Sequence, residues 1–550
     1  MKYPHLFRIA AVLLALLLCV CGLPITAMAT EAAGEAVNEE YEAKKAAYRA
    51  QLMADDVTTD DLLIGSWVSF YSFDINSYEY QLDQMAAAGI NFNIFPKNFG
   101  SGAMYSQAYW DDVEAQYAAR NMVYIMNGSM SESHIAPGVE YANGKEHCIG
   151  YHVIDEPTAD KFAEISRLVN IYRQSDSTRY PLVNLFPSYA PDWALGGTYY
   201  EHVNNFVQTV GAENIEYLSH DYYPFRDGNV VMTGIYADME VLRKVAYENG
   251  KLKTHAFPQS TAWNGTRMPS ENEMRWNVYS YLAYGFKALS WFNLVCPGSS
   301  DTEGEGFRDS LIYRDGTIRD PELYEFWSEL NWEVRGLSTV LMNLDTAHAY
   351  HTRQTDGTET LPEDYFIQPS NKRSEFIISV MEPKEGEDAY VMLFNKNYKK
   401  DTLSADFTVD LSGDVKWLEY FDPFTGEYIP VEIKDGEMEE TFRAGEGKLY
   451  RLRTDEPPVE TEEPTEEPTE EPTEEPTEVP TELSTEEVTD TPTEEITETP
   501  TVADTTAQTE AETTTEVPVE KKGCGAVVGF GTALILSVIT TAVALRKKDE

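Results

Sequence analysis

The stretch GYHVIDEPTADKF, Gly150 to Phe162, joins a short apolar segment to a helical pattern through two adjacent acids and a proline. Its apolar half lacks a clean alternation of polar and apolar residues, which is typical of a strand covered on both faces of a parallel sheet. Pro157 suits the first turn of the helix that follows. The stretch therefore predicts a strand–helix unit with Asp155 and Glu156 at the carboxyl end of the strand.

Similar apolar segments recur along the chain, with helical patterns between them whose apolar residues are spaced by three and four. The segments are LLIGSWVSF (62–70), INFNIFP (90–96), MVYIMNG (122–128), CIGYHVI (148–154), YPLVNLFP (180–187), IEYLSHDYYPF (215–225), LKTHAFP (252–258) and FKALSWFNL (286–294). These eight units predict an α/β fold, a (β/α)8 TIM barrel. An open doubly wound sheet is the alternative, but the first segment is not followed by the G-x-G-x-x-G turn that such a sheet would normally carry.

The pattern changes after the helical stretch at 320–341, where apolar and polar residues begin to alternate. Alternation occurs in EFIISVM (375–381), AYVMLFN (389–395), KWLEYFDPFTGEYIPVEI (416–433) and GKLYRLR (447–453), and PFTG favours a turn. We therefore expect the barrel at 62–344 and a small C-terminal antiparallel β-sandwich at 345–454. Residues 30–61 are expected to form a helical lead-in. The sequence SENE (270–273) predicts a helix start with Ser270 and Glu273 as a capping box.

Both ends of the chain carry patterns of export and anchoring. Lys2 and Arg8, an apolar run and the small-residue pattern AMA at 27–29 predict a signal peptide at 1–29. Residues 455–522, rich in Thr, Glu and Pro, predict a disordered stalk. The uncharged apolar run at 523–545 is long enough to cross a bilayer as a helix, and RKK begins a cytoplasmic tail at 546–550. We expect an exported, single-pass protein on the extracellular face of the cell membrane.

The charge and the cysteines restrict the possible partners. The net charge of −51 comes in part from the predicted stalk, so it says little about the folded region. The sequence lacks the clustered Lys and Arg that phosphate binding needs, which argues against nucleic acid as a partner. Cys148 and Cys296, the cysteines of the predicted folded region, do not have the spacing of a zinc site. We expect no metal site and no nucleotide, haem or other cofactor.

Side chains just beyond the strands of such a barrel converge on one site at its carboxyl end. The residues at those positions are carboxylates, amides and aromatic side chains, with one Lys and one His. Sugars suit this combination, because their C–H faces stack on rings while their hydroxyls bond to amides and carboxylates. The candidate residues are Asp74, Lys97, Asn127, Asp155, Glu156, Asn184, His220, Asp221, Tyr222, Tyr223, Gln259, Trp263, Trp291 and Asn293.

The order of several motifs between 62 and 453 resembles that of barrel glycoside hydrolases of clan A and the β-galactosidase type. The motifs are IGYHVIDEP (149–157), SHDYYPF (219–225), SYLAYGFKALSWF (280–292), LIYRDGTIRDPELYEFWSELN (311–331), FDPFTGEY (421–428) and GEGKLYRL (445–452). The resemblance implies a hydrolase of O-glycosyl bonds, and the patterns at the two chain ends add the expectation that its substrates are extracellular glycans. It matches Glu156 with the acid/base Glu after the fourth strand. Gln259 stands where those families have a nucleophilic Glu, which puts a two-carboxylate retaining mechanism in doubt.

The adjacent acids also resemble the Asp-Glu pair of β-hexosaminidases that use the 2-acetamido group of the substrate as the nucleophile. That resemblance implies that Glu156 protonates the leaving oxygen while Asp155 orients and stabilises the acetamido group. Neighbouring side chains of a strand point to opposite faces, so both acids reach one substrate only if the strand end twists or bulges. We expect a raised pKa for Glu156, so that it holds its proton near neutral pH.

Two alternatives remain open from the residues alone. Asp155 or Thr158 can cap the helix that begins near Pro157, with Glu156 favouring the helix dipole, and such a role needs no chemistry. The whole protein can also be a non-catalytic surface protein that binds a glycan or a host ligand through a degenerate glycosidase barrel. The missing carboxylate at Gln259 favours this second alternative.

Overall fold

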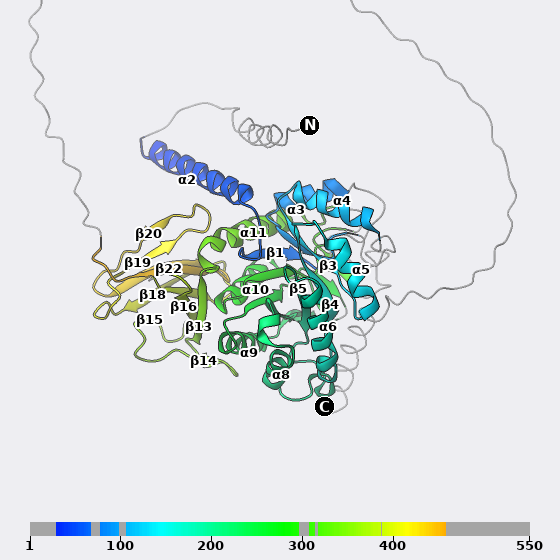
Figure 1. The fold of residues 1–550 in the computed structure, drawn as a ribbon. Coiled ribbons are helices and arrows are strands. Elements are labelled where there is room, and N and C mark those ends of the chain that lie inside the picture. The colour runs from blue at the N-terminus through cyan, green and yellow to red at the C-terminus, as the bar shows by residue number, and fades with distance from the viewer. Residues whose placement is uncertain are drawn as a thin grey trace, which may run out of the picture. The chain divides into compact units, whose positions relative to one another are not determined.

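The computed structural model describes residues 29–67, 78–97, 106–263, 265–295, 307–313, 317–386 and 388–457, all within one compact unit of the chain (Figure 1). Asp74, Cys296, the predicted membrane span, and nearly all of the predicted signal peptide and stalk lie outside these residues. No helix in the described part of the chain has the length and apolar character needed to span a bilayer.

The described residues contain a closed barrel of eight parallel strands, in the order β1-β11-β9-β6-β5-β4-β3-β2. The strands are β1 (Leu63–Ser66), β2 (Phe92–Ile94), β3 (Val123–Asn127), β4 (Cys148–Asp155), β5 (Tyr180–Leu185), β6 (Tyr217–Asp221), β9 (Lys253–Phe257) and β11 (Ala288–Trp291). Pairing of β1 with both β2 and β11 closes the ring. Each strand falls within a predicted segment or extends one residue past it, so the predicted barrel is confirmed and the open sheet is excluded.

Helices alternate with these strands and enclose them, as Figure 1 shows. They are α3 (Tyr78–Ala87), α4 (Gln107–Ala118), α5 (Glu132–Ala142), α6 (Phe162–Ser175), α7 (Asp192–Leu195), α8 (Tyr199–Val210), α9 (Ile235–Glu248), α10 (Glu271–Ala283) and α11 (Pro321–Leu341), preceded by α2 (Ala29–Ala54). Ser270 and Glu273 form the predicted capping box of α10. Asp320 caps α11 through two backbone N–H groups, and Pro321 occupies its first turn.

Alternation along each strand separates the barrel interior from the layer between strands and helices. On β6, Tyr217 packs into the interior cluster with Leu63, Ile125 and Leu182, while Leu218 packs outward against the helices. The carboxyl ends of all eight strands point the same way because the strands are parallel. Interior residues near those ends are therefore gathered at one end of the barrel.

Two sheets follow the barrel and share one apolar core. The larger sheet has the order β14 (Glu359–Thr360), β13 (Leu344–His351), β16 (Phe376–Pro383), β17 (Tyr390–Asn395), β22 (Gly447–Arg453), β19 (Trp417–Phe421) and β20 (Tyr428–Pro430). The smaller sheet has the order β15 (Ile367–Pro369), β18 (Thr402–Val409) and β21 (Glu437–Arg443). The expected antiparallel pairing holds except that β14 runs parallel to β13, so the larger sheet is mixed.

Candidate active site

Three carboxylates lie together at the carboxyl end of the barrel. Asp155 ends β4, Glu156 follows it, and Asp221 ends β6. The side-chain nitrogen of Asn184, on β5, donates to Oδ1 of Asp155 and to Oδ1 of Asp221, both at 3.0 Å. The charges of Asp221 and Asp155 both act on the carboxyl group of Glu156 and disfavour its ionised form. Side chains from three adjacent strands thus form one cluster.

The end of β4 has the irregular backbone that two adjacent acids need to reach one place. The register between β4 and β5 shifts between His152 and Ile154, which marks a bulge. Glu156 has a φ of 46°, in the left-handed region that costs a non-glycine residue roughly 1–2 kcal/mol. Its backbone N–H still donates to the carbonyl of Asn184 at 2.9 Å. This geometry directs the side chains of Asp155 and Glu156 into the same cluster.

A buried hydrogen-bond network fixes the orientation of the Asn184 amide. Ser219 donates its hydroxyl hydrogen to Oδ1 of Asn184 at 2.9 Å. Ser219 has no second hydrogen, so its 2.9 Å contact with Nδ1 of His255 makes His255 the donor there. Nε2 of His255 then accepts from Ser290 at 2.9 Å. Burial, together with the nearby charges of other histidines, lowers the pKa of His255 to about 3, which keeps the ring neutral with one N–H.

The environment keeps protons on the carboxylate cluster. Burial raises the pKa of Asp155 to about 6, although the hydrogen bond from Asn184 opposes the shift. Burial and then the charge of Asp155 raise the pKa of Asp221 to about 8. Burial, followed by the charges of Asp221 and Asp155, raises the pKa of Glu156 well above its usual value. By exposed area Asp155 and Glu156 are nevertheless only half-buried as whole residues.

Aromatic rings pack in the barrel interior near the carboxyl ends of the strands. Trp67, which follows β1 and is half-buried, packs edge-on against Phe95, His152 and Phe257 at centroid distances of 5.0, 5.1 and 5.3 Å. Trp67 was not among the candidates from the sequence, although it lies just beyond a strand, as the candidates do. In the same interior cluster, the ring of Tyr223 lies 4.8 Å from that of Trp263.

The strand alternation sends three candidate residues outward instead of into the interior. His220 bonds through Nδ1 to the hydroxyl of Tyr199 on α8, at 3.1 Å. Tyr222 packs in the layer between strands and helices. Nε1 of Trp291 donates to Asn331 on α11 at 2.9 Å. Each of these residues is next to an inward-facing one, because successive side chains of a strand point to opposite faces. Proximity to a strand end, which defines all four candidates from His220 to Tyr223, does not show which face each residue occupies.

The other candidates have varied surroundings. Asn127 ends β3, half-buried, in register with His152 of β4. Lys97 forms an ion pair with Asp112 of α4 and lies 4.4 Å from the centroid of the Tyr78 ring. Asn293 is fully buried and accepts a hydrogen bond from the backbone of the next residue.

Gln259 is fully buried and bonded to the backbone. Its side-chain nitrogen contacts the carbonyl oxygens of Phe225, Thr261 and Arg267 at 3.3, 3.2 and 2.8 Å. Its side-chain oxygen accepts from the N–H of Phe225 at 3.0 Å. Gln259 therefore joins the segments that follow β6 and β9, and both polar atoms of its amide are bonded to the backbone.

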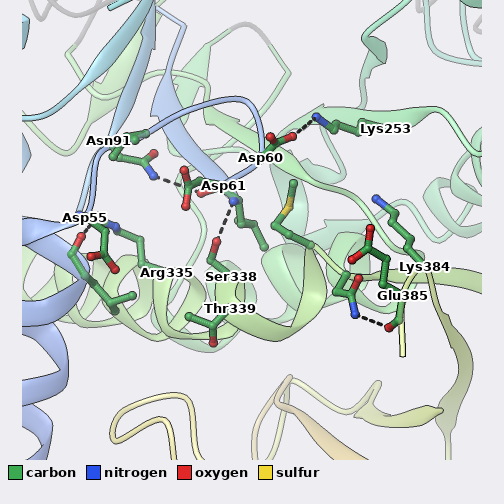
Figure 2. A pocket seen from close by; sticks show the side chains of 15 residues that line it. Asp55, Asp60, Asp61, Asn91, Lys253, Arg335, Ser338, Thr339, Lys384 and Glu385 are labelled. Atoms are coloured by element: carbon green, nitrogen blue, oxygen red, sulfur yellow. Dashed lines mark hydrogen bonds and ion pairs between the residues drawn. The ribbon is translucent and has the colours of Figure 1, made fainter. Parts of the chain in front are cut away.

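A pocket of about 440 Å³ lies at the other end of the barrel (Figure 2). Leu62, Asn91 and Lys253, at or next to the amino ends of β1, β2 and β9, contribute to its lining, together with Arg335 and Ser338 of α11. This end is remote from the carboxylate cluster, so the pocket does not belong to the candidate active site. Among the described residues, no group of three or more His, Cys, Asp or Glu side chains is placed to hold a metal ion.

No protein-family model matches the sequence, and no curated protein matches it either. The structure is similar to that of a β-galactosidase from Bacillus circulans sp. alkalophilus, with a TM-score of 0.50 and 9% identity over 72% of this chain and 99% of that chain. It is less similar to a glycoside hydrolase family 5 protein from Bacteroides vulgatus ATCC 8482, with a TM-score of 0.41 and 11% identity over 71% and 88% of the two chains. The chain therefore has the (β/α)8-barrel fold found in glycoside hydrolases, as the order of its motifs predicts.

Proposed function

We propose that this protein is a glycoside hydrolase that cleaves O-glycosyl bonds and uses Glu156 as its general acid. The observation that carries the proposal is the proton-holding cluster of Glu156, Asp155 and Asp221 at the carboxyl end of the barrel, in which Glu156 is only half-buried. General acids for this chemistry are carboxyl groups whose pKa is raised by burial and neighbouring charge. A barrel that only binds a glycan would not need a proton held on Glu156.

The arrangement supports a substrate-assisted reaction on 2-acetamido sugars. Glu156 gives its proton to the glycosidic oxygen, and the acetamido oxygen of the substrate attacks the anomeric carbon as the leaving group departs. Asp155, oriented by Asn184, accepts a hydrogen bond from the acetamido N–H and stabilises the positive charge of the cyclic intermediate. Water then opens that ring at the anomeric carbon and gives a proton back to Glu156. This route needs no enzyme nucleophile, and Gln259 provides none.

The patterns at the two ends of the chain support a location at the cell surface. We propose export by the segment at 1–29 and anchoring by the apolar run at 523–545, which would place the barrel and its glycan substrate outside the cell. Protease treatment of intact cells tests this location. Release of the folded region into the medium supports it, and protection of the whole chain contradicts it.

An assay of the purified full-length protein on paired aryl glycosides tests the function. Each pair differs only in a 2-acetamido or a 2-hydroxyl group on the sugar. Turnover confined to acetamido sugars supports substrate assistance, whereas turnover of simple galactosides contradicts this mechanism. Turnover of no glycoside favours the non-catalytic alternative.

A further inference from the structure

Arg226 lies in a well-defined backbone position on the active-site side of the barrel. It ends β7 (Phe225–Arg226), which follows β6 and pairs with β8 (Val230–Val231) in an antiparallel ribbon. A further bridge joins Arg226 to Thr266 in the segment after β9. Since its backbone is paired on both sides, the start of its side chain has little freedom.

The guanidinium of Arg226 has no carboxylate partner among the described residues. Its Nε donates to the sulfur of Met232 at 3.1 Å, a weak acceptor, and its planar head lies 5.1 Å from the centroid of the Tyr189 ring. The adjacent acid, Asp227, forms an ion pair with Arg308 at 2.8 Å. The chain has 93 acids against 42 basic residues, so an arginine without a carboxylate partner is unexpected on composition.

Tyr189 connects Arg226 to the carboxylate cluster. It follows β5, is half-buried, and stacks edge-on with Tyr222 at 5.0 Å. Burial raises the pKa of Tyr189 well above its usual value, and the charges of Arg226, Asp221 and Glu156 all act on its hydroxyl. The tyrosine is therefore close to the cluster while its ring contacts Arg226.

We propose that Arg226 binds an acidic group, a carboxylate or a sulfate ester, on a glycan whose scissile bond lies at Glu156. The inference rests on the proposed function for that placement. Carboxylate and sulfate groups fit the planar fork of a guanidinium through two parallel hydrogen bonds, and both of its terminal nitrogens are free of protein acceptors in the described part of the chain. Stacking on Tyr189 holds the fork in place before the ligand arrives.

Titration calorimetry on full-length Glu156→Gln protein tests the inference without any need for turnover. The matched probes are glucuronic acid against glucose, galacturonic acid against galactose, and N-acetylglucosamine 6-sulfate against N-acetylglucosamine. We expect at least one acidic probe to bind roughly tenfold to a hundredfold more tightly than its neutral partner, with the preference falling as salt is added. The pair that shows the preference distinguishes carboxylate from sulfate.

Arg226→Met in the same background should abolish this preference, while Arg226→Lys should keep part of it. Arg167→Met is the matched control, because it removes an arginine from the outer face of α6. Thermal melting of each variant checks the fold. Equal binding of acidic and neutral probes, including no binding of either, overturns the inference, as does a preference that survives in Arg226→Met. An acidic preference without any hydrolysis by the wild type would contradict the proposed function and the placement of a scissile bond at Glu156, and would leave the binding of an acidic group by Arg226 standing.

Discussion

Nδ2 of Asn184 lies 3.0 Å from Oδ1 of Asp155, so the amide near the end of β5 orients the carboxylate that ends β4. The same nitrogen donates its second hydrogen to Asp221 on the far side. Asn184 therefore acts as a positioning residue between two acids, and its own oxygen is held by Ser219.

Replacing Asn184 by Ala should raise the pKa of Asp155, because the carboxylate loses a hydrogen bond that favours its charged form. The acid limb of the kcat/KM profile should then move to higher pH, with a loss of about tenfold or more at neutral pH. Asn170→Ala, on the outer helix α6, is the control. A profile identical to that of the wild type would remove Asn184 from this role.

Ser219→Ala should shift the same limb in the same direction, since Asn184 loses the donor that fixes its amide orientation. Ser219→Thr keeps the hydroxyl and should restore most of the wild-type profile. A structural role alone would lower stability in Ser219→Ala without moving the pH dependence. Rate profiles and melting curves, measured together, separate these outcomes.

Asp221→Asn should stabilise the fold at alkaline pH. The pKa of Asp221 is raised from 3.8 to about 8 in the folded protein, so the folded state binds more protons than the unfolded state between these values. The free energy of unfolding therefore falls as pH rises through this window, and the neutral Asn removes that loss. Denaturant unfolding should show a gain of about 1 kcal/mol or more at pH 8 and little difference near pH 4. A gain that is equal at both values would contradict the raised pKa.

Gly336→Ala should destabilise the contact between α11 and the C-terminal sheets. A Cβ at this position would lie 1.7 Å from the carbonyl oxygen of Pro423, and neither backbone can yield easily. We expect a loss of about 1–3 kcal/mol in the free energy of unfolding. Gly138→Ala, in α5 with open space around it, should instead gain a few tenths of a kcal/mol to about 1 kcal/mol. Similar effects of the two substitutions would contradict the described packing.

The fold could be predicted because the strand segments repeat with helices between them, and strand positions followed from the apolar runs alone. Asp155, Glu156, Asn184 and Asp221 could be selected from their place at strand ends, and the structure brings them together. The sequence indicated that the end of β4 must twist or bulge for both acids to reach one place. It did not predict the left-handed conformation of Glu156, because that irregularity depends on how β5 pairs with β4.

The rest of the candidate site depends on which face of a strand each residue occupies. In SHDYYPF, Asp221 and Tyr223 belong to the barrel interior while His220 and Tyr222 face the helices. A position near a strand end does not show whether a residue faces the interior or the helices unless the register of the strand is known. Ser219 and His255 were missed because they lie inside the strands, where a polar residue is noticed only once its partner is seen.

The leaving-group dependence of Glu156→Gln tests the central claim most directly. Because the glutamine cannot donate a proton, kcat/KM for an alkyl 2-acetamido glycoside should fall by roughly 10²–10⁴-fold relative to the wild type. The loss should be much smaller for a dinitrophenyl glycoside, whose leaving group departs without a proton. An equal loss for both substrates, or no loss for the alkyl glycoside, would contradict the assignment of Glu156 as the general acid.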